Sequence, residues 1–315
     1  MIDLSKIPII DNHCHPLLEK EENIAERFSS FFTEGKNSLY VKDSMLYVHT
    51  IKDLCSLLGC EETPEAVLES RSSFSREDYI KTLFKDANID TLLIDTGYPH
   101  DALSIDQLRT LIPCKIKEIL RIETLLETLI MNSNTFYELE SKYTQILHNA
   151  VHNKDIVAFK SIIAYRSGLE IKDFRREEAE KAFQSIKNQQ KIRLESKPLL
   201  DYFIKLGLRI SAEHDLPFQI HTGFGDPDIN LLEGNPLLLL QIFQDNEKTN
   251  IVLLHGGYPY LREAGYLASI YPNVFVDLSL MIPFAQHGMV NGILSIMELA
   301  PYSKVLYGSD GFSIP

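Results

Sequence analysis

The sequence has few cysteines, no long apolar run and no leader-like start. Its four cysteines form no CxxC pair and no dense framework among 315 residues. The chain is therefore not a disulfide scaffold, and reduced thiols favour a cytoplasmic protein. No apolar run reaches the roughly 18 residues that suggest a membrane span. The first six residues lack the basic region and apolar stretch of a signal peptide, so no membrane partner is expected.

Basic residues are outnumbered, because 31 Lys and Arg stand against 44 Asp and Glu, for a net charge of −13. An acidic balance without basic clusters argues against nucleic acid or an anionic membrane as the partner. The sequence has no GxSxG nucleophile elbow and no GxxxxGK[ST] phosphate loop. Gly223 and Gly225 lack a third glycine at position 228, so the dinucleotide fingerprint fails. A small-molecule partner is expected, and assembly into a homo-oligomer stays open.

Eight short apolar runs alternate with helical segments along the chain. This alternation is typical of an α/β protein, and eight repeats favour a TIM (β/α)8 barrel over a sandwich. A long stretch without Gly or Pro, residues 123–152, is expected to be helical with a break near 132–134. The predicted strands are 7–11, 91–95, 118–122, 156–161, 217–221, 251–255, 274–278 and 304–309.

The two ends of the predicted barrel depart from the regular pattern. We interpret residues 1–315 as a single domain, in which residues 16–73 exceed what one crossover helix needs. We expect this segment to be a helical insertion near the active-site mouth, after the first strand. Five residues follow Asp310, too few for a closing helix. We therefore interpret the final helix as missing through C-terminal truncation.

The strongest local signal is the run Asp-Asn-His-Cys-His at residues 11–15. Residues i and i+2 of a strand point the same way, so His13 and His15 project together. They lie at the carboxyl end of the strand, where barrel active sites are found. Two imidazoles aimed alike can bind a metal, although HxH alone is weak and two surface histidines are the alternative. Cys14 alternates away from them and is expected to be a small core residue.

Three further polar residues stand where an apolar strand stops and a flexible loop begins. His221 and His255 end their strands and precede glycine-containing loops, and Asp310 lies between Ser309 and Gly311. One histidine at a strand end is most often structural. The coincidence of four histidines and an aspartate at one barrel mouth favours a shared site.

Lys160 lies within the apolar run at residues 156–161. A lysine in such a strand is costly unless it is paired or modified. It could reach solvent or pair with a carboxylate. The functional alternative is an amine whose charge is disfavoured by burial, which reacts with carbon dioxide to give an anionic carbamate.

The order HxH, Lys, His, His, Asp over successive strands resembles the amidohydrolase superfamily, and the match runs from His13 to Asp310. Residues 255–259 (HGGYP) and 273–279 (NVFVDLS) resemble its amidohydrolase-related, type 2 branch. Within that branch, residues 159–169 and 308–311 are similar to the domains found alone or fused ahead of glutamine synthetase. The resemblance implies a metal-dependent TIM barrel.

The resemblance also implies the metal ligands. By the family pattern, His13, His15 and Asp310 would hold one metal. His221 and His255 would hold a second metal, with the carbamylated lysine as a bridge. The type 2 branch often keeps a single metal.

In that one-metal form His221 joins the first ligand set, and His255 contacts the substrate or a bound water. Zinc is the expected ion, and manganese or iron would accept the same ligands.

These residues could support hydrolysis of a C–N or ester-like bond by metal-activated water. Asp310 would transfer the proton as general base and acid, and His255 could stabilise charge on the carbonyl oxygen. Arg166 follows the predicted lysine-bearing strand, and its fork suits a substrate carboxylate. A surface salt bridge is its alternative role. Tyr165 and Tyr258 could donate hydroxyls to the substrate, or simply pack.

Two other functions remain open at this stage. The same branch includes metal-dependent decarboxylases, in which the metal orients a carboxylate and no hydroxide attacks. The third hypothesis is a non-catalytic barrel associated with a glutamine-synthetase-like enzyme. Intact ligands argue against a pure scaffold.

Overall fold

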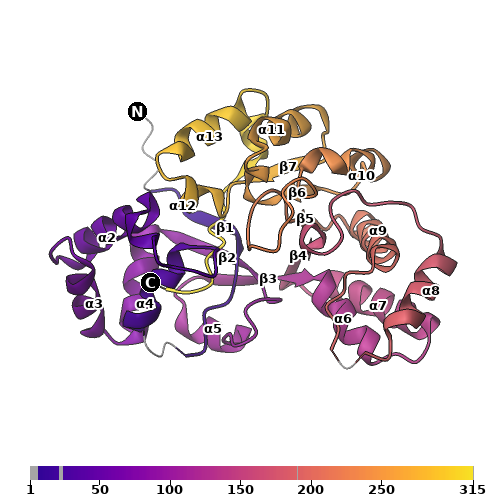
Figure 1. Ribbon diagram of the computed structural model, residues 1–315, viewed down its shortest axis with the longest axis horizontal. Helices are drawn as coiled ribbons and strands as arrows, with labels where there is room; N and C mark the ends of the chain where they lie inside the picture. The colour runs from indigo at the N-terminus through magenta and orange to yellow at the C-terminus, as the bar shows by residue number, and fades with distance from the viewer. Residues whose placement is uncertain (1–5, 21–23, 190, 315) are drawn as a thin grey trace.

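The computed structural model describes residues 6–20, 24–189 and 191–314. Eight parallel strands follow one another around a barrel in chain order, which confirms the predicted α/β barrel (Figure 1). The strands are β1 (Ile9–Cys14), β2 (Ile89–Asp95), β3 (Lys115–Arg121), β4 (Ile156–Ser161), β5 (Phe218–Ile220), β6 (Ile251–Leu253), β7 (Val274–Asp277) and β8 (Val305–Leu306).

The barrel closes between its first and last strands through backbone hydrogen bonds. Asn12 donates its N–H to the carbonyl of Tyr307 at 2.9 Å, and Asp310 donates to the carbonyl of His13 at 2.9 Å. The pairing of β1 with β2 shifts register between Asp11 and Cys14. Such an irregularity redirects side chains and is common beside active sites.

The expected strands are all present, but their ends differ from the prediction. The first strand was expected at 7–11 and runs over Ile9–Cys14, because polar Asp11 and His13 turn into the barrel instead of ending the strand. The last strand was expected at 304–309, but only Val305–Leu306 pair with β7. Apolar runs therefore locate the strands well and their polar ends poorly.

Several helices fill the connection between β1 and β2. They pack around a small apolar core of their own, which includes Phe28, Tyr47 and Ile51. Figure 1 shows α2, α3 and α4 grouped on one flank of the barrel. The segment contains α1 (Ile24–Arg27), η1 (Phe28–Phe32), η2 (Val41–Asp43), α2 (Met45–Leu58), α3 (Pro64–Ser72) and α4 (Arg76–Ala87).

The remaining helices cover the rest of the barrel, and α6 and α7 are separated at residues 132–135, close to the expected break. Figure 1 shows α6 to α9 on the flank opposite α2 to α4. These helices are α5 (Ile105–Leu111), α6 (Ile122–Met131), α7 (Phe136–Val151), η3 (Ile163–Tyr165), α8 (Arg176–Ile186), α9 (Lys197–His214), η4 (Pro236–Leu239), α10 (Leu240–Asp245), η5 (Leu254–Gly257), α11 (Leu261–Ile270), α12 (Met281–Ala285), α13 (Gly288–Met297) and η6 (Tyr302–Lys304).

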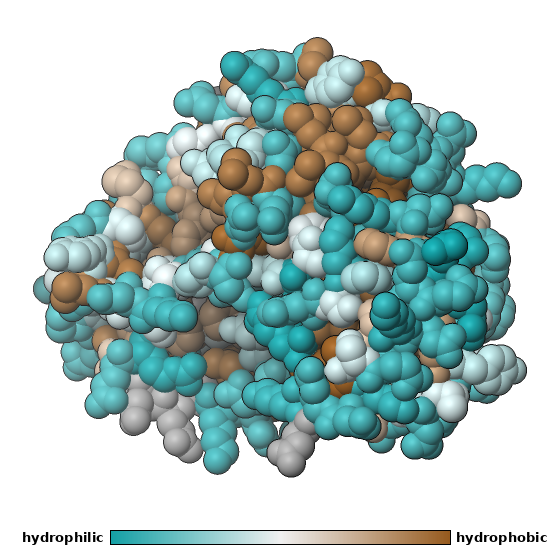
Figure 2. Space-filling view, turned by 45° about the vertical axis from the view of Figure 1, so that its right-hand side comes forward, coloured by the Kyte–Doolittle hydropathy of each residue, from teal (hydrophilic) through white to brown (hydrophobic). Residues whose placement is uncertain are grey.

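The main apolar core lies between the barrel and helices α6 to α13. Apolar side chains also reach the surface, and Figure 2 shows them gathered at the top of the molecule. Val290 and Leu294 of α13 and Ile270 of α11 are among the exposed apolar residues. Cys14 is buried in a second core cluster, as expected for a small core residue. No helix within the described ranges is both long enough and apolar enough to cross a bilayer.

Candidate metal centre

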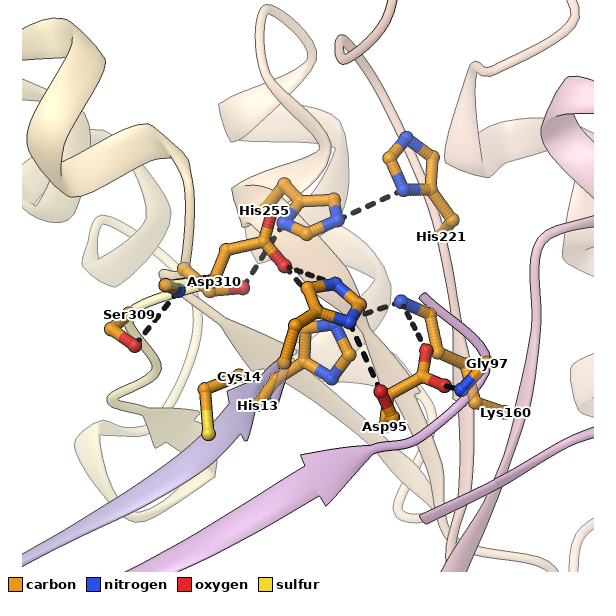
Figure 3. A network of polar contacts seen from close by, with 12 residues as sticks. His13, Cys14, Asp95, Gly97, Lys160, His221, His255, Ser309 and Asp310 are labelled. Carbon is orange, nitrogen blue, oxygen red and sulfur yellow. Dashed lines mark hydrogen bonds and ion pairs between the residues drawn. The ribbon is translucent and has the colours of Figure 1, made fainter. Parts of the chain in front are cut away.

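The carboxyl ends of the strands carry the polar residues that were singled out from the sequence. His13 lies near the end of β1 and Lys160 near the end of β4, while His221, His255 and Asp310 directly follow strands or stand a few residues beyond them. Figure 3 shows these side chains directed toward one another at the barrel mouth. The fold thus brings together all six residues proposed as metal ligands, the sixth being His15, which directly follows β1.

The imidazoles of His13 and His15 lie side by side, with ring centroids 5.1 Å apart. Oδ1 of Asp310 lies 3.1 Å from Nε2 of His13 and 3.4 Å from Nε2 of His15. Oδ1 of Asp310 is nevertheless buried without a hydrogen-bond partner within the described part of the chain. An unsatisfied carboxylate oxygen facing two imidazole nitrogens fits a site for a divalent cation.

Electrostatics favour the ligating forms of these groups. Burial and the charge of Lys160 lower the pKa of His13 to about 3, so its imidazole is neutral at physiological pH. Burial alone would raise the pKa of Asp310, but His255, His13 and His15 hold that pKa well below its usual range. A neutral imidazole and an ionised carboxylate are the forms that bind a metal.

Asp95, at the end of β2, is a member of this cluster that the sequence analysis missed. Ligand atoms of His13, His15 and Asp95 all lie within 4.8 Å of one another. Nδ1 of His15 lies 3.2 Å from the backbone carbonyl of Asp95. Donation to that carbonyl leaves Nε2 free to face the mouth, the usual arrangement behind a metal-binding histidine. The strand-end rule that picked out His221 also applies to Asp95 and could have found it.

Lys160 is fully enclosed beneath this cluster. Its Nζ lies 2.8 Å from Nε2 of His13 and 3.1 Å from Oδ2 of Asp95. Burial lowers the pKa of the Lys160 ammonium, while the charge of Asp95 opposes that change. Arg121 also binds Asp95, through an Nη2–Oδ2 contact of 2.6 Å. The buried carboxylate of Asp95 therefore pairs with two cationic side chains, those of Lys160 and Arg121.

His221 and His255 form a second pair beside the first, and Nε2 of His255 lies 2.9 Å from Nδ1 of His221. Nε2 of His221 lies 3.1 Å from the carbonyl of Phe224, so this nitrogen carries the proton. Nδ1 of His221 must then accept the hydrogen bond from His255. Burial lowers the pKa of His255 to about 4 and that of His221 well below the usual value. Both imidazoles are therefore neutral.

A cavity of about 420 Å³ opens above these side chains. Arg166 and Tyr165, which the sequence indicated for substrate binding, both line it. Arg166 is paired with Oε1 of Glu127 at 3.1 Å, and the ring of Tyr165 lies 4.3 Å from that of His221. Tyr258 is not among the described residues that line the cavity. Its ring packs 5.1 Å from that of Phe224.

The cavity also contains charged groups that no sequence motif marked. Glu34, from the long β1–β2 connection, lines it together with Asp226 and Arg193. Burial, reinforced by the charge of Asp226, raises the pKa of Glu34 to about 7. Arg193 donates to the carbonyl of Tyr165 at 3.2 Å and pairs with Asp228. These residues lie on long connections, where one sequence offers no periodic signal.

Comparisons with known proteins agree with this geometry. The family model described as Amidohydrolase matches residues 173–315. A protein from Lactobacillus casei, named a metal-dependent hydrolase, is 32% identical, and the match covers all of this chain and 86% of that one with a TM-score of 0.90. A uronate isomerase from Bacillus halodurans, 11% identical with a TM-score of 0.67 over 98% of this chain and 81% of its own, shares the fold.

Protein fluG of Emericella nidulans is 29% identical over 98% of this chain, which spans 40% of the length of that relative. The fold, the family model and the Lactobacillus relative all indicate the same family. The chain belongs to the amidohydrolase family.

Proposed function

We propose that the protein is a metal-dependent hydrolase that cleaves a C–N or ester-like bond in a small, carboxylate-bearing substrate. One observation carries this proposal. Oδ1 of Asp310 is buried and lacks a hydrogen-bond partner among the described residues, although it faces the imidazoles of His13 and His15 at the floor of a cavity. A cation between these three groups would satisfy all of them.

We propose His13, His15 and Asp310 as ligands of the first ion, with Asp95 close enough to join them. His221 and His255 would hold a second ion, and Lys160, as a carbamate, would bridge the two. The nitrogen and oxygen donors suit zinc, and also manganese or iron. When bound, such an ion lowers the pKa of water from 15.7 to about 7 and polarises a carbonyl oxygen.

The protein's own residues would complete the reaction. Asp310 would accept a proton from the attacking water and deliver it to the leaving group. In the one-metal form, in which His255 is not a ligand, its imidazole would stabilise negative charge that develops on the substrate oxygen. Arg166 would bind the substrate carboxylate by exchanging Glu127 for it, since both carboxylates fit the same guanidinium fork.

We further propose that residues 16–73 shape the cavity from within a single domain that spans 1–315. Ser30, Thr33 and Glu34 of this segment line the cavity. A cytoplasmic location stays a prediction.

The decisive experiment tests products and metal together. Purified protein loaded separately with zinc, manganese or iron is incubated with N-acyl amino acids, lactones and aromatic acids, and the products are analysed by mass spectrometry. We expect an acid together with an amine from the N-acyl amino acids, or a ring-opened hydroxy acid from the lactones, dependent on one of the metals. Release of carbon dioxide alone would assign the protein to the decarboxylases. A protein that retains no metal after each loading would contradict any metal-dependent activity.

A further inference from the structure

A second group of histidines lies outside the proposed catalytic centre. His148 is in the last turn of α7, and His152 immediately follows that helix. His214 is the last residue of α9. Ligand atoms of His148, Glu213 and His214 all lie within 4.8 Å of one another. The ring centroids of His152 and His214 are 5.3 Å apart, which brings the third imidazole to the same place.

The barrel topology explains why these residues meet. α7 leads into β4 and α9 leads into β5, and these two strands are neighbours in the sheet. The helices pack against each other, and the hydroxyl of Tyr143 donates to the carbonyl of Phe203 at 2.9 Å. Helices that precede parallel strands end at the amino-terminal face of the barrel. The histidine group therefore lies on the face opposite the cavity.

We propose that His148, His152, His214 and Glu213 form a surface site for a divalent transition-metal ion of the zinc class. Nδ1 of His148 lies 3.4 Å from Nε2 of His214. Two nitrogens bound to one zinc ion at about 2.0–2.1 Å in tetrahedral geometry are separated by roughly the same distance. The two imidazoles already have the spacing of a ligand pair.

The backbone adds a second, independent attraction for a cation. α7 and α9 both present their carboxyl ends here, and each such end carries a partial negative charge equivalent to about half an electron. Asp215 ends α9 in the left-handed conformation, with a φ of 53°, and its N–H donates to the carbonyl of Ser211. A metal bound between the helix ends would connect the two helices that precede β4 and β5.

The test uses the absence of tryptophan from the chain. Asn149→Trp, an exposed position beside His148, places a single indole next to the site. Ni²⁺ quenches indole fluorescence at short range, and Zn²⁺ competes without quenching. We expect saturable quenching by Ni²⁺ that Zn²⁺ reverses. In a His148→Ala/His214→Ala background, we expect the apparent affinity for Ni²⁺ to fall about tenfold or more. Mutation of a residue that only hydrogen-bonds to a metal ligand already lowers metal affinity by about that much.

Two variants make the result specific. His152→Ala should weaken Ni²⁺ binding while disturbing the packed helices less than the double substitution. His287→Ala, a histidine outside this cluster, should leave the quenching unchanged. Far-UV circular dichroism checks that each variant is folded. Quenching that stays the same without His148 and His214, or no saturable quenching at millimolar Ni²⁺, overturns the proposal. Both outcomes are independent of catalysis at the barrel mouth.

Discussion

Histidines gather at both ends of this barrel, and the two groups differ mainly in depth. At the mouth, His13 and His255 are almost completely buried, and burial lowers the pKa of both. At the opposite face, His152 and His214 are exposed at helix ends. Burial keeps the inner imidazoles neutral and fixes their directions, so the cost of ordering them is met when the chain folds. The outer imidazoles would lose side-chain freedom only on binding the proposed metal ion.

The comparison predicts its largest effect at the inner group. Asp310→Asn removes the charge of the proposed proton acceptor while keeping its shape. We expect turnover to fall by about 10²–10⁴-fold, the usual contribution of a positioned general base. The rate of product formation at saturating substrate measures the effect. His214→Ala, on the opposite face, is the matched control and should keep the rate of the unaltered protein. Equal loss in both variants would erase the distinction between the two faces.

A stability difference should accompany the difference in depth. Arg121→Ala leaves buried Asp95 with Lys160 as its remaining cation. We expect a loss of about 3 kcal/mol in the free energy of unfolding, because breaking a buried ion pair strands a charge. Urea unfolding at neutral pH measures it.

The control for this experiment is an ion pair on the surface. Arg262 is 73% exposed and pairs with Glu298 at 3.1 Å. Arg262→Ala should cost only about 0–1 kcal/mol. If both substitutions lower the free energy of unfolding equally, burial does not determine how much the charges beneath the proposed metal centre contribute to stability.

The cavity entrance should respond to pH through Glu34. Its pKa is raised to about 7, so the group is mainly neutral below this pH and ionised above it. A carboxylate substrate would then bind more weakly as the pH rises through 7. We expect KM to rise by roughly threefold, since partly exposed charges interact weakly.

Glu34→Gln should flatten this change in KM between pH 6 and 8, and Glu298→Gln on the surface should not. Steady-state kinetics across this range provide the measurement. A KM that keeps its pH dependence in Glu34→Gln would assign the titration to another group.

The smallest effects are expected at the outer face without metal. His148→Ala and His152→Ala should change the free energy of unfolding by less than about 0.5 kcal/mol, because His152 is exposed and His148 is only partly buried. Thermal unfolding in the presence of a chelator gives the comparison. A large loss under those conditions would mean that these imidazoles stabilise the helix ends without any ion.

Much of the site could be predicted because its residues follow apolar strands. His221 and His255 were found this way, and the same rule would have identified Asp95 had it been applied to β2. Glu34 could not be found, because its position depends on how the long β1–β2 connection folds over the mouth. The direction in which a side chain points beyond the end of a strand could not be predicted from the sequence either.

Tyr258 illustrates the last difficulty. The three residues before it, His255 to Gly257, all have a positive φ, between 63° and 64°. This left-handed run turns the chain sharply after β6. Tyr258 consequently packs against Phe224 instead of reaching the cavity. A pattern of strand ends predicts where a loop starts, but the backbone path through the loop decides where the third residue points.

The closure of the barrel has a consequence for how the centre is assembled in time. The backbone N–H of Asp310 reaches the carbonyl of His13, and the N–H of His15 reaches the carbonyl of Gly311 at 2.7 Å. Residues of the first strand and of the segment after the last strand, far apart in the sequence, therefore become neighbours only when the barrel closes. A nascent chain whose last strand has not yet been made holds only part of the proposed ligand set, so capture of an ion would report that synthesis has passed β8.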